Sequence, residues 1–328
     1  MPASDIGIDL GTNNCVVCAT GKGIVLREPT VVVYDRDLQK IKAIGEEAKQ
    51  IEMHPVGNIE VIHPIRQGTI VNYDVLEKLL KNFILKTLGR RVFRKPRISI
   101  CVPAGIKEIE KKAMEEATYQ AGARSVHLVE APIAAALGAG IDISRPCGNL
   151  LVDIGGGTTD VAVLSISGIT VSQSIKVAGN SFNQAIINYV RKTHSLFIDE
   201  QQAENIKIRI GTAVEEAETR TMDVKGRNII TGLPKVIHLT SEEVRVALRD
   251  PVGEILDCIH NVLERTPPEL AADIVDRGIV LTGGGSLLGG MERAVEEKTG
   301  INTMTAQDPA LVNAIGMGLY AEIYEKLE

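Results

Sequence analysis

The sequence contains no tryptophan, and aromatic residues of all kinds make up only 3% of its 328 residues. Proteins that bind single-stranded nucleic acid usually stack the bases on such rings, so no stacking platform is evident here. The charge does not favour nucleic acid either, because the formal net charge is -6 and no overall basic field exists to attract phosphate backbones. We therefore expect no nucleic-acid partner.

Cysteine is also scarce, and its spacing does not suggest disulfides. The five cysteines are an odd number and are scattered along the chain, which is typical of a reducing compartment. Cys15 and Cys18 form a single C-x-x-C pair inside an apolar run. Because a metal site would need further ligands, we interpret these two residues as small side chains of a strand.

Long apolar segments are missing as well. No apolar run approaches the roughly 18 residues of a membrane-spanning helix, and no charged and then apolar leader precedes a cleavage site. The simplest expectation is a cytoplasmic protein. With 44% hydrophobic and 24% charged residues, the chain has the composition of a globular protein and enough length for two cores.

Short β-branched runs alternate with amphipathic patterns of helical period, which predicts an α/β architecture. Helices are expected over residues 74–88 and 107–121, the second ending at Gly122. Strands are expected at 5–10, 15–20, 30–34, 97–102, 126–129, 149–154, 160–166, 169–177 and 277–281.

One supersecondary unit occurs twice. The stretch IGIDLGTNN at residues 6–14 is echoed by VDIGGGTTD at residues 152–160, and each consists of an apolar run, a lone Asp and a glycine turn with Thr. Each turn is followed by a second apolar run, which predicts two strand-turn-strand units. A duplicated unit predicts two similar halves with a cleft between them, and clefts are where ligands bind.

The two turns have the composition of anion-binding loops. Glycine lets backbone N–H groups approach an anion closely, and the hydroxyls of Thr12, Thr158 and Thr159 add donors. Asp9 and Asp153 end the preceding strands, where carboxylates could hold the waters of a hydrated Mg²⁺. A single Gly-Thr turn is more often only a hairpin, but two turns with the same Asp favour a phosphate site.

A third glycine cluster, IVLTGGGSLLGGM, lies at residues 279–291 and joins an apolar run to a helix expected at 287–298. A helix that begins after a strand and a glycine turn directs free N–H groups toward a nucleotide. The spacing matches neither the dinucleotide-binding fingerprint nor the Gly-x-x-x-x-Gly-Lys-Ser/Thr phosphate loop. The alternative is that these glycines only allow the helix to pack closely on the sheet.

Together these motifs resemble the superfamily of actin, sugar kinases and heat-shock chaperones, and within it the bacterial actins of the MreB family. The resemblance covers essentially the whole chain. The turns at 6–14 and 152–160 are similar to the two phosphate motifs, and residues 280–291 to the adenosine motif. More particular matches are Gly21–Pro29, Ala185–Val190, Pro267–Asp273 and Asp276–Gly285.

The resemblance implies an actin-like ATPase fold, in which two duplicated ribonuclease-H-like domains with smaller inserted subdomains surround a central nucleotide cleft. Domain I is expected over residues 1–145, with a small subdomain at about 33–65. Domain II is expected over 146–309, with a small subdomain at about 181–240. The resemblance also implies that a C-terminal helix at 310–328 returns to domain I.

The cofactors implied by the resemblance are ATP or ADP with Mg²⁺, the metal being held by Asp9 and Asp153 through water. Glu204 and Lys207 would contact the ribose or the adenine, although without the family the two residues would be interpreted as a solvated i, i+3 ion pair. The remaining binding residues would be those of the three turns: Gly11, Thr12, Asn13, Asn14, Gly155, Gly156, Gly157, Thr158, Thr159, Gly283, Gly284 and Gly285.

The resemblance further implies that the chain polymerises head to tail into paired protofilaments, which guide cell-wall synthesis and rod shape together with membrane proteins of that machinery. Such filaments lie at the inner face of the cell membrane. Here Val92 and Phe93 stand among five basic residues in GRRVFRKPR at 89–97, as in a loop that docks on anionic lipid. The alternative is a basic loop that packs its Phe on its own domain.

Three positions depart from the family pattern. Family members carry a Glu before the Pro of the segment LVEAPIAAA at 128–136, where it orients the attacking water, and this chain has Ala131. Glu130 is one residue away and should point to the opposite face, while Thr158, the other water-positioning residue, is retained. We expect slow ATP hydrolysis, unless a local shift rescues Glu130 or another group orients the water. The turn at residues 11–15 also departs, with Asn13 for Ala and Cys15 for Thr.

Two other functions of the same superfamily compete with this hypothesis. A small-molecule kinase would need a catalytic Asp and polar sugar-binding residues in the cleft, and no motif for either is found. A chaperone ATPase would need a peptide-binding domain, for which the sequence leaves no room before its end at residue 328. Both functions are less consistent with the motifs than a filament-forming ATPase. Because the hydrolytic step is expected to be impaired, whether the chain acts as an enzyme stays open.

Overall fold

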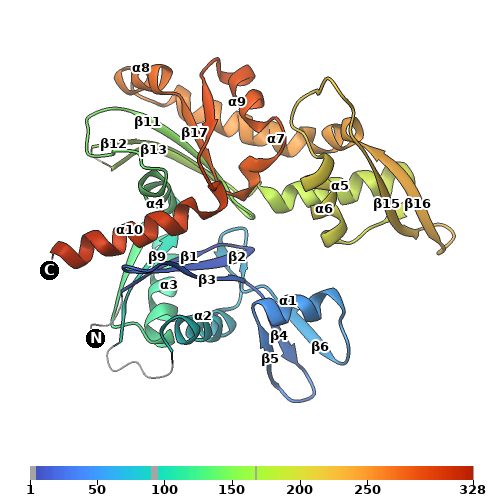
Figure 1. Cartoon of the computed structure of the whole chain (residues 1–328), viewed down its shortest axis with the longest axis horizontal. Helices are drawn as coiled ribbons and strands as arrows, with labels where there is room; N and C mark the ends of the chain where they lie inside the picture. Colours follow the sequence, from blue (N-terminus) through green and yellow to red (C-terminus); the bar gives the residue numbers. More distant parts are fainter. Residues whose placement is uncertain (1–4, 90–94, 167, 328) are drawn as a thin grey trace.

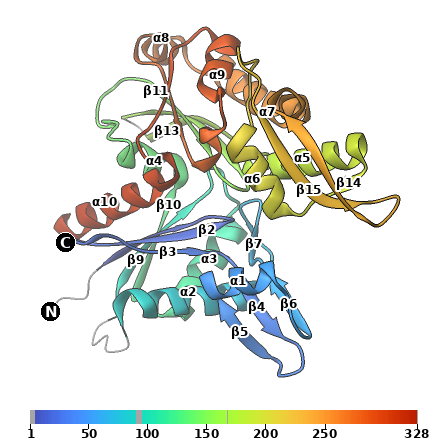
Figure 2. The same ribbon diagram turned by 45° about the vertical axis from the view of Figure 1, so that its right-hand side comes forward.

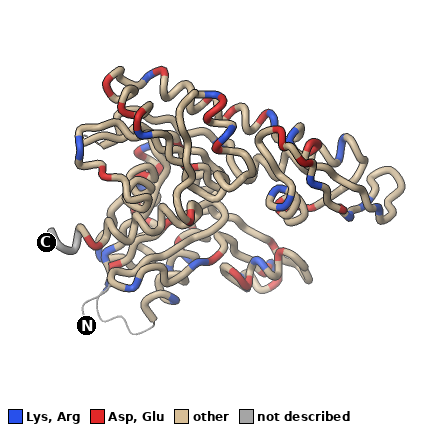
Figure 3. Tube along the Cα trace, turned by 45° about the horizontal axis from the view of Figure 1, so that its top comes forward, with Lys and Arg blue, Asp and Glu red and all other residues tan. Residues whose placement is uncertain are grey.

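The computed structural model describes residues 5–89, 95–166 and 168–327. It contains two five-stranded sheets, one from each half of the chain, stacked above one another with helices between and around them (Figure 1). The first sheet has the order β10-β9-β1-β2-β3 and the second the order β13-β12-β11-β17-β18. Acidic and basic residues are interspersed along the described trace (Figure 3).

The two sheets share one topology, which confirms the duplication predicted from the echoed motifs. In the first, β1 (Ile6–Leu10) pairs antiparallel with β2 (Asn14–Ala19) and parallel with β9 (Arg97–Val102). In the second, β11 (Asn149–Ile154) pairs antiparallel with β12 (Thr159–Ser165) and parallel with β17 (Ile279–Thr282). Each echoed turn therefore joins the central strand of a sheet to its antiparallel neighbour.

The outer strands complete the equivalence. They are β3 (Gly23–Pro29) and β10 (Ser125–Glu130) in the first sheet, and β13 (Gly168–Ile175) and β18 (Thr303–Thr305) in the second. Strand β3 was not predicted from the sequence, because its residues are mostly exposed and show no apolar alternation.

Helices α4 (Ala131–Gly138) and α10 (Val312–Leu327) lie between the two sheets (Figure 2). They approach so closely that a Cβ added to Gly316 would lie 1.7 Å from the carbonyl oxygen of Ala134. Helix α10 packs on the first sheet through β1, β2 and β9. The C-terminal helix thus returns to the first half of the chain and connects both halves through α4.

Most of the remaining helices pack into the apolar cores of the two halves. Helices α2 (Tyr73–Leu88) and α3 (Glu108–Ala121) bury their apolar faces in the core of the first sheet, close to the expected bounds. The core of the second sheet includes residues of α5 (Gly179–His194), α6 (Glu200–Ile210), α7 (Ser241–Glu264), α8 (Pro268–Arg277) and α9 (Met291–Thr299).

Each half carries a small three-stranded insertion, and both insertions extend toward the same end of the molecule (Figure 1). The first contains β4 (Val32–Asp35), β5 (Lys40–Ile44), β6 (Ile59–Ile62) and α1 (Glu46–Met53). The second contains β14 (Leu196–Phe197), β15 (Thr221–Asn228) and β16 (Pro234–Thr240). The boundary near residue 145 separates the two large sheets, and its role as a division between domains stays a prediction.

The third glycine cluster differs from the expected direct entry into a helix at 287–298. Strand β17 is followed by a short 3₁₀ helix, η1 (Gly284–Leu287), and α9 begins only at Met291. Gly290 has a left-handed backbone with φ of 69°, which a continuous α-helix does not allow. The Gly289-Gly290 pair is therefore a break that separates the turn from the helix.

Candidate functional site

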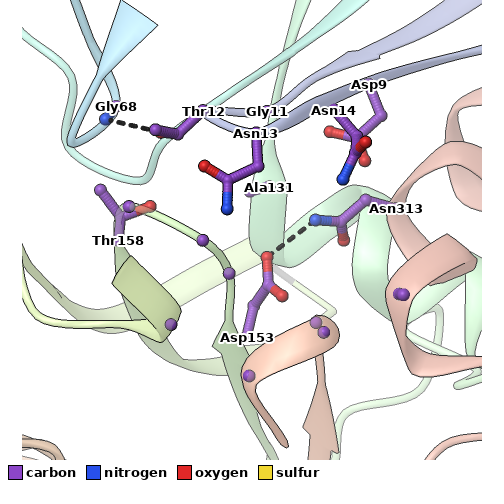
Figure 4. Close-up of a pocket in the computed structure, with 18 of the residues that line it drawn as sticks. Asp9, Gly11, Thr12, Asn13, Asn14, Gly68, Ala131, Asp153, Thr158 and Asn313 are labelled. Atoms are coloured by element: carbon purple, nitrogen blue, oxygen red, sulfur yellow. Dashed lines mark hydrogen bonds between the residues drawn. The ribbon is translucent and has the colours of Figure 1, made fainter. Parts of the chain in front are cut away.

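The two echoed turns face each other across one cavity of about 500 Å³ (Figure 4). The cavity also reaches the third glycine turn and α6. Of the described site residues predicted from sequence, all but one line it: Asp9, Gly11, Thr12, Asn13, Asn14, Ala131, Asp153, Gly155, Gly156, Gly157, Thr158, Glu204, Lys207, Gly283, Gly284 and Gly285. Segments separated by almost the entire chain thus converge on one place.

Thr159 is the exception. Its side chain is fully buried, and its hydroxyl donates to the carbonyl oxygen of Val177 at 2.7 Å. The side chain of the neighbouring Thr158 is directed toward the opposite turn, as expected when successive residues of a strand point to opposite faces (Figure 4). The hydroxyl of Thr159 therefore supports the strand and does not reach the cavity.

The turns are close enough that glycine is required between them. A Cβ added to Gly157 would lie 2.3 Å from Oγ1 of Thr12, well inside van der Waals contact. The same hydroxyl accepts a hydrogen bond of 3.3 Å from the backbone N–H of Gly68, which follows β7 (Ile65–Arg66). The turns therefore form a narrow cradle rimmed by hydroxyls and backbone amides, which suits a phosphate chain.

Three acidic side chains converge on the cavity from the two sheets. Burial, and then the charge of Asp153, raises the pKa of Asp9 to about 7. Burial also raises the pKa of Asp153, although hydrogen bonds from Asn313 at 2.7 Å and Thr282 at 3.3 Å favour its charged form. Burial raises the pKa of Asp160 to about 6, with the charge of Asp153 as the second cause. Buried like charges of this kind favour a cation nearby.

The arrangement fits a hydrated Mg²⁺ held against phosphates better than a metal held by protein alone. Among the described residues, no group of three or more His, Cys, Asp and Glu side chains is placed to hold a metal ion directly. Mg²⁺ commonly keeps several waters and uses one or two carboxylates together with substrate phosphates. Asp9 and Asp153 supply carboxylates of that kind beside the two glycine turns.

The third glycine turn packs tightly and also lines the cavity. Gly283 has φ of 79°, and a Cβ added to it would lie 2.3 Å from the carbonyl oxygen of Ile154. Its N–H donates to the carbonyl of Pro309 in η2 (Pro309–Leu311) at 2.9 Å. These glycines therefore allow close packing, which was the alternative explanation for them, and they also line the cavity.

Glu204 and Lys207 form an ion pair in which Lys207 is largely buried and Glu204 is partly exposed. The ammonium of Lys207 contacts Oε2 of Glu204 at 2.7 Å and the carbonyl oxygen of Gly179 at 3.3 Å, and only 13% of its side chain is exposed. The buried amide of Asn183 also donates to Glu204 at 2.7 Å. The pair is therefore fixed where α6 meets the start of α5, at the wall of the cavity.

Ala131 begins α4 at the wall of the cavity. It is 6% exposed and packs against an apolar cluster that includes Cys101, Val129 and Met317. Ala131 lines the cavity. The preceding residue, Glu130, is not among the described residues that line it. The hydroxyl of Thr158, across the cavity, is hydrogen-bonded to Asp160.

Sequence reasoning missed several residues of the site. Asp160 is the last residue of the second echo. Antiparallel pairing of the two strands around this turn places it beside Asp153, so the sequence pattern could have predicted its position at the site. Asn313 and Asn180 come from segments without a motif, and only the folded chain brings them to the turns.

Val92 and Phe93 lie outside the described residues. Within the described residues, no helix has the length and apolar character needed to span a membrane.

Comparison of the sequence with known proteins identifies one family over nearly the whole chain. The pattern of the MreB/Mbl protein family matches residues 3–328. The chain is 45% identical to the cell shape-determining protein Mbl of Bacillus subtilis over 327 residues, which cover 100% of this chain and 98% of Mbl. It is 43% identical to the cell shape-determining protein MreB of Escherichia coli over 330 residues, covering 99% and 95% of the two chains.

Comparison of the structure gives a matching result. MreB5 of Spiroplasma citri bound to ADP superimposes with a TM-score of 0.94 at 34% identity, covering 99% of this chain and 98% of that one. The same protein bound to AMPPNP gives a TM-score of 0.93. The subunit of the MamK double helical filament, at 22% identity, shares the fold with a TM-score of 0.82. The duplicated sheets, the converging turns and these likenesses together place the chain in the MreB/Mbl family of actin-like proteins.

Proposed function

We propose that this chain binds ATP or ADP with Mg²⁺ between its two halves and polymerises head to tail into paired protofilaments that organise cell-wall synthesis. The observation that carries the proposal is the convergence of two equivalent glycine turns, each preceded by an Asp that lines the cavity, on one place. Support comes from MreB5 of Spiroplasma citri, which is 34% identical and was solved with ADP and with AMPPNP.

Each part of the site has a role in this proposal. The turns at Gly11–Asn14 and Gly155–Thr158 hold the phosphates with backbone N–H groups and hydroxyls. Asp9 and Asp153 hold the waters of Mg²⁺, which when bound would neutralise charge on the phosphates. The third turn and the two residues of α6 contact the adenosine: Gly283, Gly284, Gly285, Glu204 and Lys207.

Hydrolysis of ATP is slow in this proposal because no carboxylate stands at position 131. A positioned general base contributes typically about 10²- to 10⁴-fold in rate. Thr158 remains to orient a water, while Ala131 presents only a methyl group to the cavity. The groups that hold the nucleotide are all retained, so binding is expected to be strong where turnover is weak.

Growth of a filament requires a heterologous contact between opposite ends of successive subunits, because an isologous pair closes on itself. Membrane attachment is proposed through Val92 and Phe93 in the basic segment 89–97, with the filament lying at the inner face of the cell membrane. One subunit would bind anionic lipid weakly, and many subunits in a filament would bind by avidity. Membrane proteins of cell-wall synthesis are the proposed partners there.

A small-molecule kinase is the alternative enzyme, and it is not favoured. The family match and the relatives named for cell shape cover essentially the whole chain. We also found no sugar-binding motif in the sequence.

The experiment that tests the proposed function is electron microscopy of the purified chain with Mg-ATP, together with calorimetry of nucleotide binding. Filaments are expected with Mg-ATP and no added substrate, and ATP uptake is expected to depend on magnesium. Buffer without nucleotide is the control. A chain that takes up no adenine nucleotide in magnesium buffer would contradict the proposal.

Replacing Ala131 by Glu should restore hydrolysis, because it returns a base to the wall of the cavity. Single-turnover phosphate release is expected to accelerate by roughly 10²-fold or more. Ala131→Leu is the control, since it enlarges the side chain without adding a group that can accept a hydrogen bond from water, and it should stay slow. Equally fast release by the unsubstituted chain and by Ala131→Glu would show that another group already positions the water.

Removing the charge of Asp9 should stabilise the chain when magnesium and nucleotide are absent. The pKa of Asp9 is raised to about 7, so its contribution to stability is full below its unfolded pKa of about 3.9 and is lost as the pH rises to about 7. At pH 8, Asp9→Asn is expected to raise the free energy of unfolding by about 1–3 kcal/mol, with a smaller gain at pH 5.5.

The measurement is denaturant unfolding of the metal-free chain at both pH values, with the exposed Asp250→Asn as a control. The same Asp9→Asn substitution should abolish the stabilisation that Mg-ATP gives the unsubstituted chain. A variant that is less stable than the unsubstituted chain at pH 8 would show that the Asp9 carboxylate is not destabilised by its surroundings.

Substituting the proposed lipid-binding side chains should release filaments from membranes. We expect Val92→Ser/Phe93→Ser to reduce co-sedimentation with anionic liposomes under polymerising conditions, since the inserted apolar area is lost. Uncharged phosphatidylcholine liposomes serve as the control for charge. Unchanged co-sedimentation of the variant would reject this segment as the anchor.

A further inference from the structure

Two asparagines join the two halves of the molecule at the site by a reciprocal amide pair. Nδ2 of Asn13 donates to Oδ1 of Asn180 at 2.8 Å, and Nδ2 of Asn180 donates to Oδ1 of Asn13 at 2.9 Å. Asn13 belongs to the turn between β1 and β2, and Asn180 lies in the first turn of α5. Asn13 is also a position where this chain departs from the Ala of the family pattern.

The pair lies between two cavities. The inner cavity of about 500 Å³ contains the glycine turns and the buried aspartates. A second cavity of about 1070 Å³ lies beside it, lined by residues of both small insertions or of the segments leading to them, such as Lys49 and Glu200. Asn13 lines both cavities, and Asn180 lines the second.

Both partners are held firmly by their own half of the molecule. The backbone N–H of Asn180 donates to the carbonyl of Gly156 at 2.8 Å, and the carbonyl of Asn13 accepts from the N–H of Thr30 at 2.9 Å. A Cβ added to Gly156 would lie 2.7 Å from Nδ2 of Asn13, so the Asn13 amide rests on the opposite turn. Separation of the halves at this point therefore breaks the amide pair before the backbone around it can move.

Other hydrogen bonds between the halves are deeper or longer. The N–H of Ala104 donates to Asp160 at 3.2 Å in a buried position, and Asn313 donates to Asp153 from α10. Lys176 contacts Oγ1 of Thr69 at 3.4 Å. The asparagine pair and the contact of Lys176 with Thr69 are both exposed, so both can open without disturbing the core. The asparagine pair is the shorter of the two and the reciprocal one, and it holds the turns themselves together.

We propose that Asn13 and Asn180 form a latch that closes the phosphate end of the cleft and limits the rate at which nucleotide is exchanged. The proposal rests on the nucleotide-binding function proposed above. Opening the latch costs two hydrogen bonds and lets the turns separate, which frees the path between the two cavities. Because neither amide carries a charge or titrates near neutral pH, the latch itself is insensitive to salt and pH.

The experiment measures the dissociation of a fluorescent ATP analogue, chased with excess ATP in magnesium buffer, for Asn13→Ala, Asn180→Ala and the double variant. Each single substitution is expected to accelerate dissociation by about tenfold, since each removes both hydrogen bonds. The double variant should be no faster than the faster single variant, because the two residues act as one unit. Asn188→Ala is the control, because Asn188 is an exposed asparagine of the same helix whose side chain accepts a hydrogen bond from Gln184, one turn earlier in α5.

The outcomes separate a latch from a direct contact with phosphate. If Asn13 acted only by touching the nucleotide, Asn180→Ala would leave dissociation unchanged, and additive effects in the double variant would likewise overturn the latch. Small-angle X-ray scattering of the nucleotide-free monomer gives a second readout. The double variant should have a larger radius of gyration than the unsubstituted chain, and an identical radius would overturn the latch.

The scattering comparison also keeps the two proposals distinguishable. If the unsubstituted chain bound no analogue at all, the proposed nucleotide-binding function would fail. An expanded double variant would then still support the latch as a contact that closes the cleft, and an unexpanded one would reject it.

Discussion

The rest of the structure depends on two carboxylates, one buried and one partly buried, that lie near the ends of equivalent strands and line the same cavity. Asp9 and Asp153 belong to different sheets, and the charge of Asp153 contributes to the raised pKa of Asp9. Burying like charges without a compensating cation costs free energy, so the fold maintains an arrangement that is unfavourable in the empty protein. A ligand that brings both a cation and a polyanion compensates these charges, which explains why the turns carry glycines, hydroxyls and acids at once.

Keeping Asp9 and Asp153 beside the same cavity requires a firm connection between the two halves of the chain. The connection is made by α4 and α10, where Gly138 and Gly316 let the two backbones come into contact. Asn313, near the start of α10, donates to Asp153, so the helix that packs on the first sheet also holds the acid of the second. The deep side of the cleft is thus fixed by packing, and movement is easiest at the outer side, where polar contacts such as Asn13 with Asn180 predominate.

Much of the fold and of the site could be predicted because both are encoded in local patterns that occur twice. The echo of Asp, Gly and Thr located both turns, and the apolar runs around them located the central strands. Predictions failed where a residue acts through a tertiary contact. Nothing near Asn180 or Asn313 in sequence marks them, because their partners lie more than a hundred residues away. Likewise Thr159 has the same residue type as Thr158, and only the pleat of the strand decides which hydroxyl meets the cavity.

The position of Ala131 gives a structural reason for the proposed separation of nucleotide binding from hydrolysis. Its backbone is fixed by the start of α4, and its methyl group meets an apolar cluster on one side and the cavity on the other. A longer acidic side chain at this position would extend into the cavity and would leave the cluster unchanged. None of the carboxylates, hydroxyls or glycines proposed to hold the nucleotide depends on that side chain for a hydrogen bond. In the proposed function, a single substitution here would change how the attacking water is held and would leave in place the groups that hold the phosphates.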